Sequence, residues 1–440
     1  MLLYIHVPFC RAKCRYCAFY SRPLESEAAL GTWARALDAD LRAWGEALRN
    51  TGTDMAPLFF ADGTDGTYGR HGVRSATPGS GDLRPRVTSI FFGGGTPSLL
   101  SPALLGRLLD RAAREFSLSG DVEISMEANP ESMTPEKTAG FRAAGVSRVS
   151  LGVQALDDAL LSSVGRVHSR AQALAAFEGL RRAGFDSVGL DFIWGLPGES
   201  PASWRAQLEE AASLQPEHLS CYGLTLEEGT PLFEQRRGLS LPGEDEQAAM
   251  YADCGEILEK HGFRQYEISN FARPGFECRH NLGYWLGEDY LGLGPSAVSS
   301  MQGERWAQPA DLAAWLAAPR GQRPGPELCE SLSFREQAEE LVMLRLRTAR
   351  GLPLEEYRRF TGRDFAADNA ALIAALEAEG LAAVTGEEDG TASRALASFS
   401  PHGRPEACGP RFALTRAGML VSNAVIEQCF ESLPDAPASA

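Results

Sequence analysis

Two hydrophobic patterns alternate along the first half of the chain. Short, nearly continuous apolar runs have strand length, and helical stretches follow them, in which apolar residues recur every three or four positions. Polar caps followed by proline mark several helix starts, among them Ser101-Pro102 and Ser200-Pro201. Six runs are predicted to be strands: 2–7, 87–92, 121–128, 147–154, 187–196 and 218–226.

This alternation of strand and helix predicts an α/β fold in which helices cover a parallel sheet. The pattern fits an open doubly wound sheet and an incomplete barrel equally well. In both architectures, side chains at the carboxyl ends of the strands line the functional site. The residues of chemical interest fall at these ends: Cys10, Gly93 to Gly95, Glu127, Gln154 and Asp191.

The pattern breaks at residues 317–327, AAPRGQRPGPE, which predicts a domain boundary. We expect a first domain over 1–316, a small, mainly helical domain over 328–430, and a disordered tail over 431–440. Residues 51–86 are rich in Gly, Asp, Thr and Pro and lack a period, so a mobile surface insertion is predicted there. The expected elements of the second domain are helices over 334–346 and 368–381, and a strand and a helix within 412–430.

Composition is that of an ordinary globular protein, with 44% hydrophobic and 23% charged residues. The formal net charge of −16 argues against general nucleic-acid binding, which needs a basic surface. No apolar run approaches the roughly 20 residues of a membrane-spanning helix. The first residues, MLLYIHVPFC, carry neither the basic start nor the cleavage site of a signal peptide, so a cytoplasmic location is expected.

Three of the nine cysteines, Cys10, Cys14 and Cys17, lie within eight residues of one another in C-x3-C-x2-C spacing. A loop this tight can direct three thiolates at one iron–sulfur cluster and leave one iron open. A zinc site and three unrelated thiols are the alternatives; zinc would need a fourth ligand, for which His6 is the nearest choice. The other cysteines are expected to be small buried hydrophobic residues: Cys221, Cys254, Cys278, Cys329, Cys408 and Cys429.

The cysteine spacing matches that of radical S-adenosylmethionine (SAM) proteins. The chain resembles the oxygen-independent coproporphyrinogen III oxidases and their relatives, the HemN-like family, over most of residues 1–310. The segments that carry this resemblance are YIHVPFC, FFGGGTPSLL, EANPE, LGVQALDD, GRVH and DFIWGLPGE. The resemblance implies an incomplete (β/α)6 radical SAM barrel with a HemN-like C-terminal domain, and so selects between the two architectures.

Three features resemble the heme chaperone (HemW) branch of this family. Phe19 occupies the position where the oxidases carry an additional cysteine, and the chain starts almost at its first strand, without the extension of the oxidases. His280-Asn281-Leu-Gly-Tyr284-Trp285 matches the H-N-x-x-Y-W motif of the chaperone branch. Coproporphyrinogen oxidase activity is therefore the less favoured alternative, and no catalytic residue is assigned.

The resemblance also implies a set of cofactor residues. A [4Fe-4S] cluster would be held by the three clustered cysteines, and SAM would lie beside it. The glycine-rich loop and the strand-end polar residues would contact SAM, with Arg166 offering its fork of donors to the SAM carboxylate. The implied SAM-binding residues are Tyr4, Tyr16, Gly94, Gly95, Thr96, Glu127, Gln154, Arg166 and Asp191.

Heme is the third implied cofactor. Imidazole is a common axial ligand of heme iron, and aromatic rings pack against porphyrin faces, so His280, Tyr284 and Trp285 are the heme candidates. Cys278 is a second candidate ligand. The implied partners are a heme acceptor such as a respiratory cytochrome, an electron donor such as a flavodoxin or ferredoxin, and a second copy of the chain in a homodimer.

Overall fold

The computed structural model describes residues 1–50, 83–386 and 409–437. Most of the predicted insertion, 51–86, therefore lies outside the described residues. None of the described helices has the length and apolar character needed to cross a membrane. The chain divides into two compact units. The first unit comprises Met1–Glu199, Leu224–Pro242 and Asp289–Ser331, and the second comprises Ser200–Gly223, Gly243–Glu288 and Leu332–Ala440.

The first unit is built on a sheet whose strand order is β14-β13-β12-β11-β1-β4-β5-β6-β7. All neighbours from β11 to β7 are parallel, and β11 to β14 are antiparallel. Together with β8 of the second unit, the long strands confirm the six predicted ones. Their bounds are β1 Leu2–Val7, β4 Arg86–Gly94, β5 Ser117–Ala128, β6 Arg148–Gln154, β7 Ser187–Trp194 and β8 His218–Gly223.

Strand β1 shows why these runs are apolar. It pairs with β4 on one side and β11 on the other, and Leu2, Leu3, Ile5 and Val7 are all buried. A parallel strand covered on both faces needs apolar side chains on both faces, so it reads as a continuous hydrophobic run. The first unit is thus an α/β structure of parallel strands and helices, as the hydrophobic pattern predicted.

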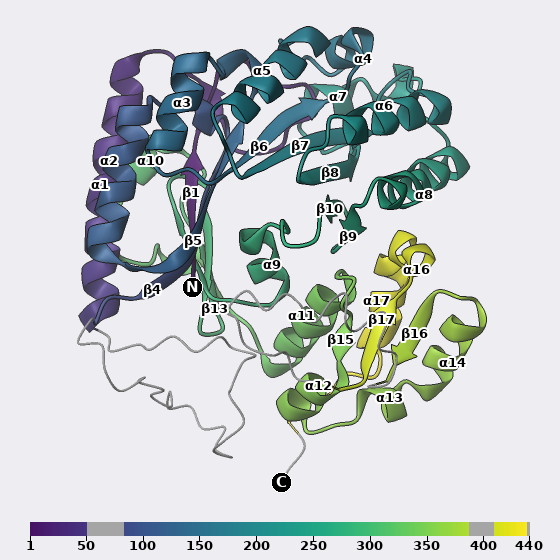
Figure 1. Cartoon of the computed structure of the whole chain (residues 1–440). Helices are drawn as coiled ribbons and strands as arrows, with labels where there is room; N and C mark the ends of the chain where they lie inside the picture. The colour runs from purple at the N-terminus through teal and green to yellow at the C-terminus, as the bar shows by residue number, and fades with distance from the viewer. Residues whose placement is uncertain (51–82, 387–408, 438–440) are drawn as a thin grey trace. The chain divides into compact units, whose positions relative to one another are not determined.

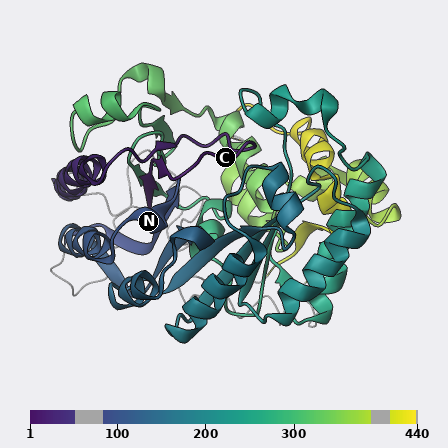
Figure 2. The ribbon, with the colours of Figure 1, turned by 90° about the horizontal axis from the view of Figure 1, so that it is seen from above.

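Helices cover the outer side of this sheet in the order α1, α2, α3 and α5, each packed on the next (Figures 1 and 2). The predicted caps are present: Ser101 and Thr134 accept hydrogen bonds from the first-turn amides of α2 and α3, which both begin at proline. The helices of this unit are α1 Glu27–Asn50, α2 Pro102–Glu115, α3 Pro135–Ala143, α4 Asp158–Ser163, α5 Arg170–Arg182, α7 Pro231–Glu234 and α10 Leu312–Ala317.

Four short strands that extend the large sheet of the first unit beyond β1 were not predicted. They have three or four residues each and contain Gly, Ser or charged residues, so they lack the apolar run that marks the other strands. Cys329, which was expected to be buried, is exposed in the last of them, and this strand extends the first unit through Ser331. They are β11 Tyr290–Leu293, β12 Val298–Met301, β13 Glu304–Ala307 and β14 Cys329–Ser331.

The second unit begins with α6 and β8, and β8 pairs with two short antiparallel strands in the order β8-β10-β9. The ring nitrogen Nε2 of His218, on β8, lies 2.8 Å from the hydroxyl of Tyr266. The elements of this part are α6 Pro201–Ser213, α8 Glu244–Lys260, β9 Arg264–Gln265, β10 Asn270–Ala272 and α9 Arg279–Trp285.

The remainder of the second unit contains the expected helices and the strand expected near residue 412, which is β17. This strand lies between two strands that were not predicted, in a sheet of order β15-β17-β16. The terminal segment 431–440 is described as far as 437. Leu433 is buried there and its carbonyl accepts a hydrogen bond from Arg335, so the segment is ordered at this residue. The elements are α11 Phe334–Leu346, β15 Leu352–Pro353, α12 Leu354–Thr361, α13 Phe365–Asp368, α14 Ala370–Ala378, β16 Ala382–Thr385, β17 Arg411–Leu414, α16 Arg416–Leu420 and α17 Ser422–Phe430.

Candidate functional site

The three clustered cysteines lie on a loop that two short strands close. Cys10 ends β2 (Phe9–Cys10), which pairs in parallel with β3 (Arg22–Pro23). The amide of Leu24 donates to the Cys10 carbonyl at 3.0 Å, and the amide of Cys17 donates to the Cys14 carbonyl at 3.3 Å. All three thiols are free and partly exposed. The loop therefore presents its sulfur atoms at the surface of the first unit.

Backbone hydrogen bonds fix this loop to the body of the first unit. The amide of Arg15 donates to the Val164 carbonyl at 3.0 Å, and the Arg15 carbonyl accepts from the amide of Leu232 at 2.9 Å. Gly165 has φ +76°, and a Cβ atom there would lie 3.1 Å from Cγ of Arg15. Gly165 thus allows the loop to approach closely at a backbone conformation that other residues rarely adopt.

Two polar side chains donate toward the thiol sulfur atoms. Thr96 Oγ1 lies 3.5 Å from Cys10 Sγ, and Arg166 Nη1 lies 3.4 Å from Cys14 Sγ. Hydrogen bonds of this kind to sulfur ligands orient them toward a bound metal. Burial raises the pKa of the third thiol, that of Cys17. The donor set at Cys10 and Cys14 fits sulfur atoms that carry negative charge.

The donors near the cysteine loop can be compared with those that a metal site needs. Across residues 1–50, 83–386 and 409–437, no three His, Cys, Asp or Glu side chains converge as ligands of one metal ion. His6, the nearest candidate for a fourth zinc ligand, has Nδ1 3.1 Å from the Tyr4 hydroxyl and Nε2 2.8 Å from the Tyr20 carbonyl. Both ring nitrogens of His6 are therefore already in contact with the protein. The three thiols supply the donor type that an iron–sulfur cluster needs.

The glycine-rich loop, Gly93 to Gly95, packs closely against strands β1 and β2. Gly94 has φ +105°, and a Cβ atom there would lie 2.5 Å from the ring of His6. A Cβ on Gly95 would lie 2.6 Å from the Phe9 carbonyl oxygen. These two positions accept only glycine because the loop packs on β1 and β2. The next residue is Thr96, and this packing places its hydroxyl beside the Cys10 sulfur.

Two strand-end carboxyl groups interact beside this loop. The amide of Gly94 donates to Glu127 Oε2 at 3.1 Å. Burial, together with the negative charge of Asp191, raises the pKa of Glu127 to about 8. Asp191 Oδ1 accepts a hydrogen bond from Ser150 Oγ at 2.8 Å. A cationic group placed beside these two carboxyl groups would favour their ionised forms.

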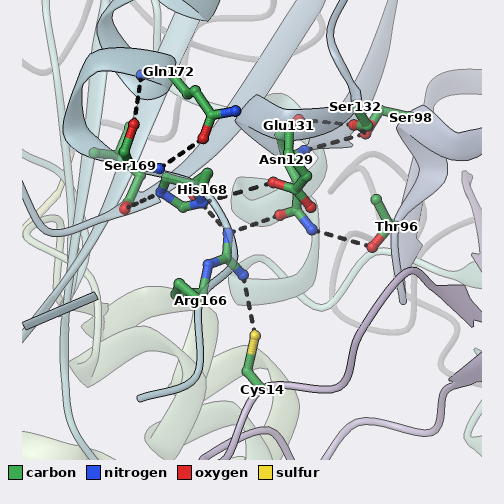
Figure 3. A network of polar contacts seen from close by, with 12 residues as sticks. Cys14, Thr96, Ser98, Asn129, Glu131, Ser132, Arg166, His168, Ser169 and Gln172 are labelled. Atoms are coloured by element: carbon green, nitrogen blue, oxygen red, sulfur yellow. Dashed lines mark hydrogen bonds and ion pairs between the residues drawn. The ribbon is translucent and has the colours of Figure 1, made fainter. Parts of the chain in front are cut away.

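Arg166 is the centre of a polar chain that links Cys14 with Asn129 and Thr96 (Figure 3). Its Nη2 donates to Asn129 Oδ1 at 2.8 Å and to the Gly152 carbonyl at 2.6 Å. Asn129 Nδ2 in turn donates to Thr96 Oγ1 at 3.2 Å. The chain therefore runs from Cys14 through Arg166, Asn129 and Thr96 to Cys10. It couples the orientation of one thiol to that of the other.

Gln154 lies near Arg166 and has an uncommon backbone conformation. It has φ +65°, and the pairing of β6 with β7 shifts register between Gly152 and Gln154. A Cβ on Gly152 would lie 2.8 Å from Gln154 Nε2 and 3.0 Å from Arg166 Nη2. Positive φ is uncommon for residues with a Cβ and is frequent at functional sites. The irregularity directs the Gln154 amide to the Arg166 side of the strand end.

A buried histidine supports the same strand end. His168 Nε2 lies 3.0 Å from the Val153 carbonyl, and Nδ1 lies 3.6 Å from Glu131 Oε2 (Figure 3). Ser169 and Gln172 form a capping box that starts α5 directly after His168. The short segment from Arg166 to Ser169 is therefore fixed at both ends, which restricts the Arg166 side chain.

The two predicted tyrosines have different surroundings. The ring of Tyr4 stacks on Phe91, and its hydroxyl contacts His6. Tyr16 packs against the hydrophobic cluster that includes Leu161 and Val164, and burial raises its pKa. The structure thus brings together most of the predicted site residues in the first unit, and it adds Asn129 and Ser150, which sequence reasoning missed. Asn129 could have been found from its position between a strand end and Pro130.

The heme candidates lie on α9 in the second unit, and their histidine is not free to bind iron as it stands. His280 has a relative exposure of 0%, and its Nε2 lies 3.1 Å from the Tyr284 hydroxyl. The two rings meet edge to face, with centroids 4.9 Å apart. Cys278 is buried as well, whereas Tyr284 and Trp285 are partly exposed. In this arrangement the His280 ring is not accessible, and its Nε2 is already in contact with the Tyr284 hydroxyl.

Comparison with known proteins adds independent findings. Residues 81–211 match the Radical SAM superfamily, and residues 332–388 match the HemN C-terminal domain. The heme chaperone HemW of Bacillus subtilis is 34% identical over 365 residues, which cover 82% of this chain and 86% of that protein. The heme chaperone HemW of Mycobacterium tuberculosis is 37% identical over 359 residues, 80% and 83% of the two chains.

A solved structure has a similar fold. Coproporphyrinogen III oxidase (HemN) from Escherichia coli superposes with a TM-score of 0.72, covering 98% of this chain and 89% of that chain. The sequence identity is 21%, so this likeness concerns the fold. The radical SAM fold of the first unit therefore has a solved counterpart of nearly the same extent.

Proposed function

The chain belongs to the HemN-like radical SAM family, within its HemW branch, and on that premise we propose that it binds heme and transfers it to an acceptor protein. The observation that carries this proposal is the sequence identity of 34% and 37% to two heme chaperones, over most of this chain and most of each of those proteins. The oxidase shares the fold at 21% identity, and Phe19, 71% exposed, stands where the oxidases carry their additional cysteine.

Membership of the radical SAM family implies a [4Fe-4S] cluster and SAM. We propose that Cys10, Cys14 and Cys17 bind three irons of the cluster and leave the fourth to SAM. When bound, the cluster supplies an electron that can cleave the sulfonium of SAM. Thr96 and Arg166 donate to two of the sulfur ligands, so they adjust the charge on the cluster and hold the thiolates in place.

The remaining polar residues of the first unit are proposed to hold SAM. Glu127 and Asp191 form a carboxyl pair that suits the ammonium of the methionine part, and Arg166 suits its carboxylate. Gln154 lies beside Arg166 and provides an amide for the same group. Tyr4, Tyr16 and the Gly94–Thr96 segment complete the proposed SAM site.

Heme is proposed to bind at α9. His280 provides the imidazole, and Tyr284 and Trp285 provide partly exposed aromatic rings that can pack on a porphyrin face. Iron binding through Nε2 would require the buried His280 ring to become accessible and its contact with the Tyr284 hydroxyl to be lost. The acceptor is then a hemoprotein such as a respiratory cytochrome, and a flavodoxin or ferredoxin supplies electrons to the cluster.

A titration of anaerobically reconstituted protein with hemin, followed by the Soret band, tests this proposal. We expect saturable binding with an imidazole-ligated spectrum, and a weaker, altered spectrum in His280→Ala. The competing activity is measured in parallel by incubating the protein with coproporphyrinogen III, SAM and dithionite. Turnover to protoporphyrinogen, or the absence of saturable hemin binding, would overturn the proposed function.

A further inference from the structure

The guanidinium of Arg345, on α11, is buried in the second unit. Its relative exposure is 2%, and that of its partner Glu356 is 6%. Nε donates to Glu356 Oε2 at 3.0 Å and Nη2 donates to Oε1 at 2.5 Å, which makes the pair bidentate. Removing two charges from water is costly, so a pair at this depth needs further hydrogen bonds to be satisfied.

Those further bonds go to the end of another helix. Arg345 Nη1 donates to the Trp285 carbonyl at 2.5 Å, and Nη2 donates to the Leu286 carbonyl at 3.2 Å. Trp285 is the last residue of α9 and Leu286 is its C-cap. Carbonyl groups at a helix C-terminus lack partners within the helix, and a positive charge is favourable there. Arg345, a residue of α11, therefore provides hydrogen-bond donors for the C-terminal carbonyl groups of α9.

Helix α9 depends on such contacts for its position. It has seven residues, which is too short for a helix that is stable on its own. Leu282 of this helix packs with Tyr266 and Ala272 in a small core cluster. Without the Arg345 hydrogen bonds, the carbonyls of Trp285 and Leu286 would each lose a donor.

We propose that the Arg345–Glu356 pair is a positioning device that holds α9 in the orientation needed for heme binding. This inference rests on the proposed function, because α9 carries His280 and Tyr284. Both residues of the pair lie within 332–388, which match the HemN C-terminal domain. The C-terminal part of the chain thus acts on heme binding without touching heme, by fixing the backbone at Trp285 and Leu286. The Tyr284 side chain can still rotate while this backbone stays in place.

The test replaces the pair as a whole. In the double variant Arg345→Met/Glu356→Leu both charges are removed and the volume is filled, so the fold is retained without a lone buried charge. The matched control is Asp40→Leu/Arg320→Met, which removes a partly buried ion pair of the first unit. Two quantities are measured on the reconstituted protein: hemin affinity from the Soret band, and hydrogen exchange of the backbone amides in 279–288.

We expect the Arg345/Glu356 double variant to bind hemin about tenfold more weakly, as for loss of residues that orient a metal ligand. The amides of 279–288 should exchange faster even in the absence of hemin. The control should change neither quantity. Unchanged exchange at α9, or unchanged hemin affinity despite faster exchange, would overturn the positioning role. A wild-type protein that binds no hemin refutes the proposed function instead, while the exchange data still report whether the pair holds α9.

Discussion

The cysteine loop and helix α9 differ in how far each is prepared for its cofactor. At the cysteine loop, Thr96 and Arg166 already donate toward two partly exposed sulfur atoms. At α9, His280 is buried and its Nε2 contacts Tyr284. Preorganisation lowers the cost of binding, whereas a site that must first break a contact binds less tightly and releases more readily. The contrast suits a resident cluster in one region and a transferable heme in the other.

The largest expected effect comes from removing a cluster ligand. Cys14→Ser should abolish the four-iron absorption after anaerobic reconstitution, since three thiolates are the full set of protein ligands proposed. Hemin binding to the same variant should persist, because α9 belongs to the other unit. Iron and sulfide analysis with a parallel hemin titration checks both statements. A variant that still assembles a normal cluster would contradict the ligand assignment.

The next effect concerns the polar chain between the two thiols. Arg166→Met removes the donors to Asn129, the Gly152 carbonyl and Cys14. The variant also removes the proposed hydrogen bonds to the SAM carboxylate. A hydrogen bond to a charged group contributes about 1.5–3 kcal/mol, so SAM affinity should fall by about tenfold or more while the cluster still forms. Isothermal titration of the reconstituted protein with SAM measures this. The control is Arg182→Met on the exposed face of α5, and equal SAM affinity in Arg166→Met would remove Arg166 from the site.

A smaller and opposite effect is expected at α9. Tyr284→Phe keeps the aromatic ring and removes the hydroxyl that contacts His280 Nε2. A neutral hydrogen bond contributes about 1 kcal/mol, so hemin should bind about fivefold more tightly. Weaker binding by Tyr284→Phe would show that the hydroxyl assists heme binding instead of blocking it.

The smallest effect is a pH dependence of stability in the cluster-free protein. The pKa of Glu127 is raised to about 8 from an ordinary value of 4.5, so the native state binds this proton more tightly than the unfolded chain. Its stabilising contribution is complete below about pH 4.5 and is lost as the pH rises through 8. Between about pH 4.5 and pH 8, the melting temperature of Glu127→Gln should therefore fall less than that of the wild-type protein. Identical pH profiles of the melting temperature would contradict the shift.

Much of the fold could be predicted because burial on both faces leaves a strong mark on the sequence. The sequences of strands β1 and β4 to β8 are nearly continuous apolar runs. Helix caps such as Ser101 are found at the predicted positions. The strands β11 to β14, and the strands β15 and β16 that pair with β17, could not be predicted, since elements of two to four residues carry no periodic pattern. Their pairing depends on long-range contacts.

The candidate site shows the same difference between residues with a local sequence signal and residues whose role depends on long-range contacts. Cysteine spacing and strand-end position identified Cys10 and Glu127, because these signals are local. Asn129 and Ser150 were missed because their roles come from side chains that other strands bring near. The burial of His280 was also not visible in the sequence, since it depends on how α9 packs.

Transfer of heme is the most direct test of the account. Reconstituted protein loaded with hemin is mixed with the apo form of a b-type cytochrome, and the Soret spectrum is followed over time. The account predicts that the imidazole-ligated spectrum of the chaperone is replaced by that of the holo-cytochrome, with slower loading by His280→Ala. Heme that stays on the protein, or an acceptor that fills no faster than with free hemin, would contradict it.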